Sequence, residues 1–118
     1  MKEFVLIFRN SVPEGDKPSP EQMQQLLTDW MNWMGGIAAQ DKLADKGHRL
    51  SMSEGKTVKA GDVVTDGPYT EVKEFINGFI IVRTATIEEA VAIARECPIL
   101  HIGGHVEVRK VVSPDDQS

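Results

Sequence analysis

Large apolar side chains alternate at the start of the chain, where Phe4, Leu6 and Phe8 share one face of an extended segment. A period of two is typical of a β-strand. Val5 and Ile7 make the other face apolar as well, so we expect a strand that is buried over most of its surface. The residues that follow include Pro, Gly, Asp and Ser, which predicts a loop.

The pattern then changes to a helical period. Ser19 can cap a helix, Pro20 suits its first position, and Gln22 completes a capping box. One face over about five turns is apolar and consists of Met23, Leu26, Leu27, Trp30, Met34 and Ile37. Gly35 and Gly36 weaken the end of this helix by about 1 kcal/mol each relative to alanine. We interpret them as a place of close backbone packing.

The second half of the chain predicts more strands and one more helix. Thr86 and Glu89 form a second capping box, and Pro98 ends the helix that follows. The apolar stripe of that helix is Ile87, Ala90, Val91 and Ala94. Strands are expected at residues 49–52, 57–59, 63–65, 79–84 and 106–112.

The resulting order, β-α-β-β-(β)-β-α-β, predicts a ferredoxin-like α+β fold with two helices on one face of an antiparallel sheet. The other face of such a sheet stays open, and we expect Val5, Ile7, Phe79 and Ile81 to lie on it. An open apolar face of this size is typical of an interaction surface. We therefore expect a homodimer that closes two sheets around a shared cavity.

The composition fits one domain and excludes several classes of protein. The length of 118 residues is that of one typical domain. Thirteen basic and 18 acidic residues give 13 − 18 = −5, which disfavours direct nucleic-acid binding. A single cysteine excludes an internal disulfide and a zinc site with two or more cysteines. No run approaches the ~20 apolar residues of a membrane span, and no signal peptide is evident, so we expect a cytoplasmic protein without a membrane partner.

Four sequence blocks occur in an order that matches a known family. They are Asp66-Gly67-Pro68-Tyr69, Thr70-Glu71-Val72-Lys73-Glu74 with Gly78, Cys97-Pro98, and Gly104-His105-Val106-Glu107-Val108-Arg109. With these blocks the chain resembles the DGPF branch of the YCII-related proteins, although Tyr69 stands where the branch often has Phe. The resemblance implies a domain over residues 1–112 that dimerises as an α+β barrel with a pocket between sheet and helices. Residues 113–118 form a polar tail.

The resemblance leaves the activity open. Some members of the wider superfamily are enzymes that act on small lactones or halogenated ring-cleavage products through a His and an Asp. Here residues 20–40 lack the histidine, and Cys97 stands in place of the aspartate, so that dyad cannot be carried over. One hypothesis is a small-molecule-binding homodimer that acts as a cofactor-independent acid–base enzyme on a small organic acid or lactone. The other is a non-catalytic accessory or regulatory protein linked to sigma-factor-dependent transcription.

A polar cluster beside the Asp-Gly-Pro turn is the first candidate site. Asp66 and Glu74 are candidate catalytic acid and base, because two neighbouring carboxylates can hold different protonation states. Lys73 would hold an anionic substrate, with Tyr69 and Glu71 beside it. The alternative is that Asp66 caps the turn and the other charged side chains form surface salt bridges.

The candidate substrate-binding residues elsewhere are Arg109, His48 and Trp30. Arg109 can bind a carboxylate, or it can pair with Glu107 or across the sheet. His48, at the start of a strand, can act as a base, or it is an exposed loop histidine. Trp30 and Trp33 cannot both be central to one buried stripe, so one is expected in the core and the other at a ligand pocket or in the dimer.

Metal and cofactor signals are weak. His101 and His105 are four apart, but Gly103 and Gly104 disfavour the helix that would bring them to one face, so we expect no metal. No phosphate-cradling glycine motif is present, and no cofactor is expected. Cys97 follows a helix C-terminus, where the dipole disfavours a thiolate, and we expect a buried structural thiol.

Overall fold

The computed structural model describes residues 1–11, 19–51, 54–66 and 74–115. Helix α1 spans Pro20–Ala39, helix α2 spans Ile87–Ala94, and a 3₁₀ helix, η1, spans Pro98–Ile102. The strands are β1 (Lys2–Ser11), β2 (Leu43–Arg49), β3 (Lys56–Lys59), β4 (Val63–Asp66), β5 (Glu74–Thr84) and β6 (His105–Lys110).

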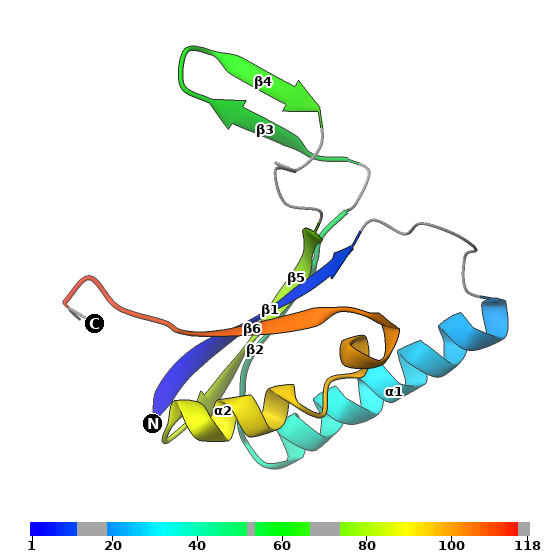
Figure 1. Cartoon of the computed structure of the whole chain (residues 1–118). Helices are drawn as coiled ribbons and strands as arrows, with labels where there is room; N and C mark the ends of the chain where they lie inside the picture. Colours follow the sequence, from blue (N-terminus) through cyan, green and yellow to red (C-terminus); the bar gives the residue numbers. More distant parts are fainter. Residues whose placement is uncertain (12–18, 52–53, 67–73, 116–118) are drawn as a thin grey trace.

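Four strands form the main sheet, in the order β2-β5-β1-β6, and every neighbouring pair is antiparallel. Helices α1 and α2 both lie on one side of this sheet (Figure 1). This arrangement confirms the expected ferredoxin-like α+β fold. It leaves the opposite face of the sheet without a helix among the described residues.

The core lies between the sheet and the helices. Alternate residues of β1 point into it, and Phe4, Leu6 and Phe8 are almost completely buried, as expected. Ile80 and Val82 of β5 lie beside them. The small residues Ala90 and Ala94 let α2 approach this layer closely, while Val106 and Val108 close it on the β6 side.

Helix α1 begins where the sequence predicts, but its packing differs from the prediction. The Gln22 backbone N–H donates to Ser19 Oγ at 3.1 Å and the Ser19 N–H donates to Gln22 Oε1 at 2.8 Å, which confirms the capping box. Met23 and Leu27 are 49% and 58% exposed, because the first half of the helix extends beyond the sheet (Figure 1). The close packing expected at Gly35 and Gly36 is wrong, since nothing lies within 4 Å of an added Cβ at either position.

Strand β2 lies earlier than expected, at Leu43–Arg49 rather than 49–52. Two register irregularities against β5 interrupt its alternation, so the period of two is absent from its sequence. Gly47 adopts φ +63°, and its N–H donates to Asp45 Oδ1 at 2.7 Å. The backbone of β5 passes so close to Gly47 that an added Cβ would overlap the Phe79 carbonyl oxygen.

Helix α2 is capped by Thr86, whose Oγ1 accepts from the Glu89 N–H at 3.3 Å. The second half of the expected capping box differs, because Glu89 Oε2 accepts from the N–H of Ala85 rather than of Thr86. Ile87 is 42% exposed, so its expected place in the buried stripe is wrong, and Ile93 packs against the core instead. Helix η1 was not expected.

Strands β3 and β4 form a separate two-stranded sheet, which confirms the strands expected at 57–59 and 63–65. This hairpin stands apart from the main sheet, on the side away from the helices (Figure 1).

The contact at Gly47 predicts a large loss of stability on substitution. Gly47→Ala combines left-handed backbone strain with an overlap against β5, and we expect a loss of about 3 kcal/mol or more in the free energy of unfolding. Gly103→Ala is the matched control, because Gly103 has φ +82° but no atom within 4 Å of the added Cβ. It should cost about 1 kcal/mol. The free energy of unfolding of both variants is measured by urea unfolding. An equal loss in Gly47→Ala and Gly103→Ala would contradict the close approach of β2 and β5.

Candidate functional site

The open face of the sheet carries an apolar patch. Val5 lies opposite Ile81 and Ile7 lies opposite Phe79 across the β1–β5 pair, so all four side chains share one face. Each is half-buried. The expectation that these residues lie on the open face is confirmed. We call Val5, Ile7, Phe79 and Ile81 the apolar floor.

An ion-paired group borders the floor on the β6 side. The Nε–H of Arg9 donates to Glu107 Oε1 at 3.2 Å, which links β1 to β6. Arg109 Nε lies 3.8 Å from Glu107 Oε2, and the Arg109 side chain is 70% exposed. Glu107 therefore pairs across the sheet with Arg9 and along its own strand with Arg109, as the structural alternative for these residues predicted. The guanidinium of Arg109 is still largely open to solvent.

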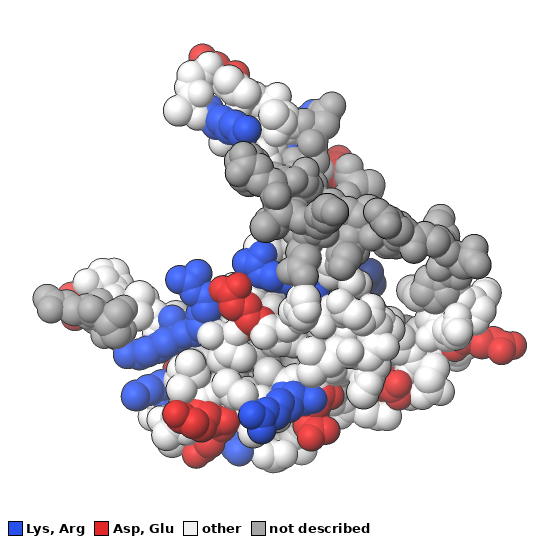
Figure 2. Space-filling view, in the orientation of Figure 1, with Lys and Arg blue, Asp and Glu red and all other residues white. Residues whose placement is uncertain are grey.

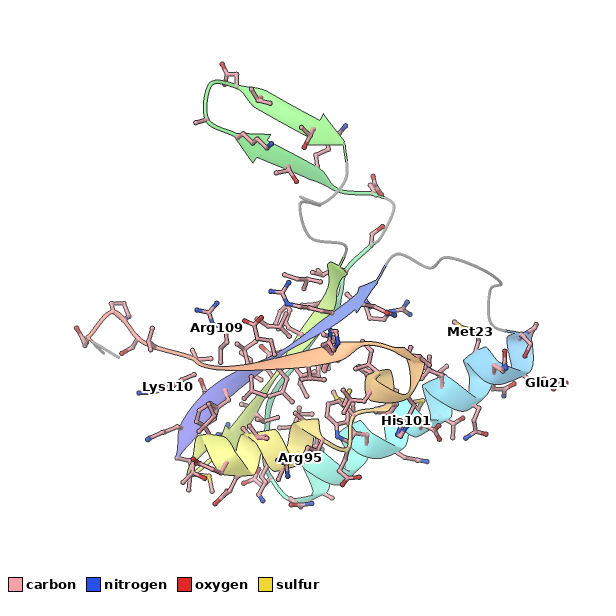
Figure 3. All side chains as sticks on the ribbon, in the orientation of Figure 1. Glu21, Met23, Arg95, His101, Arg109 and Lys110 are labelled. Atoms are coloured by element: carbon pink, nitrogen blue, oxygen red, sulfur yellow. The ribbon has the colours of Figure 1, made fainter. Side chains whose placement is uncertain are left out.

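The position of Arg109 is visible in Figure 3, where it lies on the side of the sheet away from α2. A further basic residue, Arg83, lies opposite Glu3 on the same face of the β1–β5 pair. Figure 2 shows Lys and Arg side chains together at this side of the sheet, with acidic side chains among them. The floor therefore has charged groups of both signs around it.

His48 borders the floor on the opposite side. It lies near the end of β2 rather than at the start of a strand, and it pairs with Phe79 in register. The centroids of the two rings are 6.2 Å apart. Because β2 and β6 are the two edge strands, His48 and Arg109 stand at opposite borders of the floor. The structure brings both residues to one face.

Trp30 lies on the other side of the sheet. Its ring centroid is 4.8 Å from that of Phe8 and 5.4 Å from that of Trp33, and Trp33 also contacts Phe8. Trp33 Nε1–H donates to the Ile93 carbonyl at 3.1 Å. The expectation that only one indole packs on the core is wrong. Both fit because Phe8 presents its ring to two adjacent turns of α1.

The polar cluster lies at the ends of described strands. Asp66 is the last residue of β4 and Glu74 is the first residue of β5. The side chains of both fall outside the described residues, as do Tyr69, Glu71 and Lys73 altogether. Their roles remain predictions.

Cys97 is a buried thiol, as expected. It is fully buried, and burial raises its pKa from the ordinary value of 9.0 to about 11. A backbone hydrogen bond at Ile99 acts in the opposite direction but is the weaker influence. The thiol is therefore protonated at neutral pH and is a poor nucleophile.

Hollows are found at two places on the described structure. One, of about 400 Å³, lies between α1 and α2 and includes Trp33, Ile37 and Ile93. The other, of about 480 Å³, lies at the end of the sheet and includes Lys2, Arg83 and Lys110. Within the described residues no three His, Cys, Asp or Glu side chains are placed to hold a metal ion.

Comparison with known proteins identifies the family. A model of the YCII-related domain matches residues 4–114, so the chain belongs to the YCII-related family. A search of curated proteins found no match. Among the described helices, none is long and apolar enough to cross a membrane.

The raised pKa of Cys97 predicts a loss of stability at high pH. The unfolded thiol loses its proton near 9.0, whereas the native thiol keeps it to about 11. Raising the pH through this interval therefore stabilises only the unfolded state, and the free energy of unfolding falls. Urea unfolding of the wild type and Cys97→Ala at several pH values isolates this effect. If the free energy of unfolding changed with pH in the same way in both proteins, the predicted effect of Cys97 would be contradicted.

Proposed function

We propose that this YCII-related protein binds a small organic anion on the open face of its sheet, in a cavity that a second copy of the chain completes. The observation that carries the proposal is the apolar floor with Arg109 exposed at its border. The string Asp66-Gly67-Pro68-Tyr69 supports a place in the DGPF branch of the family.

The chemistry of this face suits a ligand with an apolar body and a carboxylate. The floor would contact the body, and the guanidinium of Arg109 can bind a carboxylate through two parallel hydrogen bonds. Glu107 already holds Arg9 at 3.2 Å but is 3.8 Å from Arg109. A ligand carboxylate can therefore engage Arg109 without breaking the link between β1 and β6.

The need for a second copy follows from the exposure of this face. Small-molecule sites generally enclose most of their ligand. A single open sheet covers only one side of a bound molecule. Two copies that place their floors face to face would enclose it and would cover the apolar side chains of both sheets.

Acid–base catalysis is the activity we propose for this site, without an organic cofactor. Glu74 begins β5, the same strand that carries Phe79 and Ile81 of the floor. Asp66 and Glu74 would transfer a proton in the isomerisation of a small organic acid, or in the hydrolysis of a lactone, where water adds to the carbonyl carbon and the ring oxygen leaves as an alcohol. Lys73, Tyr69 and Glu71 would hold the substrate there, and His48 offers a further base at the β2 border.

A non-catalytic accessory role, linked to sigma-factor-dependent transcription, is the second candidate. The observation that favours it is the protonated thiol of Cys97, which stands where enzymes of the superfamily are expected to have an aspartate. Both candidate functions include ligand binding on the floor. Only the first predicts that the bound molecule is converted to a product.

Binding can be tested with simple carboxylates. Benzoate and hexanoate should raise the melting temperature, because a ligand that binds the native state stabilises it. Arg109→Gln should raise the benzoate Kd about tenfold, through loss of a charge-assisted hydrogen bond. Arg95→Gln is the matched control, since Arg95 is exposed on the helical side of the molecule (Figure 3). Equal weakening in both variants, or no stabilisation by either carboxylate, would refute the site.

Catalysis can be tested at the two carboxylates. Once a substrate is identified, Asp66→Asn and Glu74→Gln should each lower kcat about 10²-fold or more, with ligand Kd and melting temperature unchanged. Asp62→Asn is the control, because Asp62 adopts φ 62° in the same hairpin and asparagine accepts that conformation. Unchanged turnover in both test variants would leave only the binding role.

A further inference from the structure

A hollow of about 400 Å³ lies between α1 and α2, and we call it the interhelical groove. Both helices cover the face of the sheet opposite the apolar floor (Figure 1), so the groove is separate from the site proposed above. Its apolar lining is formed by Trp33 and Ile37 from α1 and by Ile93 from α2. The Trp33 Nε1–H donates to the Ile93 carbonyl at 3.1 Å, which links the two helices. A volume of about 300–1,000 Å³ is typical of a small-molecule site.

Two small residues leave this space open. Gly36 of α1 and Ala92 of α2 both line the groove. A Cβ added at Gly36 would meet no atom within 4 Å, so close packing does not require a glycine there. A glycine inside a helix makes the helix less stable than an alanine would. Gly36 therefore lowers helix stability and keeps the wall of the groove free of a side chain.

One end of the groove carries charges of both signs. Lys42 follows α1, and its carbonyl accepts from the Arg83 N–H at 2.6 Å, so it lies near the start of α2. Glu89, in the first turn of α2, also lines the groove. Its Oε2 accepts from the Ala85 N–H at 3.4 Å. One basic and one acidic side chain therefore line the groove at this end, and their charges offset each other.

The other end of the groove is acidic. Glu96 follows the last turn of α2, and its N–H donates to the Ile93 carbonyl at 3.2 Å. Glu96 is exposed and lines the groove, as does Asn32 of α1. Arg95 is next to Glu96 in the chain but is not among the residues that line the groove. The C-terminal end of a helix carries a partial negative charge, which also favours a cation here.

We propose that the interhelical groove binds a small organic amine, with its ammonium group at Glu96 and its apolar body on the indole and isoleucine side chains of the lining. An ammonium and a carboxylate form a charge-assisted hydrogen bond. An ammonium has three donors, and the amide oxygen of Asn32 can accept a second hydrogen bond from it. The residues of the groove all belong to one chain, so this site does not depend on a second copy or on the ligand of the floor.

Titration with 2-phenylethylamine tests the proposal. The indole N–H signal of Trp33 in ¹H–¹⁵N NMR spectra should shift, because this side chain lines the groove, and the shift gives the Kd. 2-Phenylethanol, a neutral molecule of similar shape, should bind about fivefold more weakly, because it lacks the positive charge. No shift of the Trp33 signal, or equal affinities for the amine and the alcohol, would overturn the proposal.

The two adjacent glycines of α1 locate the site. Gly36→Leu should raise the amine Kd about tenfold or more, because the new side chain fills the groove. Gly35→Leu is the matched control and should leave the Kd within about twofold. Gly35 also has no atom within 4 Å of an added Cβ, but it does not line the groove. Neither variant should lower the melting temperature, since leucine favours a helix more than glycine does. Equal effects of the two variants on the Kd would overturn the site.

A charge variant tests the same contact without changing the shape of the groove. Glu96→Gln should raise the amine Kd about fivefold and leave the Kd of 2-phenylethanol unchanged. Glu88→Gln is the control, because Glu88 is exposed on α2 but does not line the groove. An amine Kd that is the same in the wild type and in Glu96→Gln would overturn the proposal, even if Gly36→Leu failed to fold.

Discussion

The alternation of side chains along β1 is the constraint on which the rest of the structure depends. Phe4, Leu6 and Phe8 point to the helices, and Val5 and Ile7 point to the other face, so this central strand is apolar on both sides. The described helices cover only one of these sides. Burial of apolar surface away from water is favourable. We therefore expect a further layer of protein or ligand to cover the side that carries Val5 and Ile7.

The positions of the polar groups follow from that asymmetry. Arg9 and Glu107 pair across β1 and β6 because their strands are neighbours in the sheet, although 98 residues separate them in the chain. His48 reaches the same face from the other edge through its pairing with Phe79. An apolar floor between two polar borders is therefore a consequence of the strand order. It is the reason for the proposal that a ligand and a second copy bind on this face.

The sequence predicts the parts of the fold that local chemistry determines. Ser19, Thr86 and the alternation of β1 define the helix starts and the central strand, and each is confirmed. Strand β2 was misplaced because contacts with β5, rather than its own pattern, hold it in place. The Arg9–Glu107 pair and the packing of both indoles on Phe8 are long-range contacts with no local signal. For the polar cluster at Asp66 and Glu74, only the strand ends are described, and their catalytic roles stay predictions.

We expect the apolar floor to be covered in solution. The most direct measurement is the attenuation of methyl NMR signals by a soluble paramagnetic probe. If the floor is covered, the methyl signals of Val5, Ile7 and Ile81 are protected nearly as well as those of buried Ile80, while those of Ile102, which is 48% exposed, are strongly attenuated. Attenuation of the three floor residues to the level of Ile102 would instead show that this face of the sheet is bare in solution.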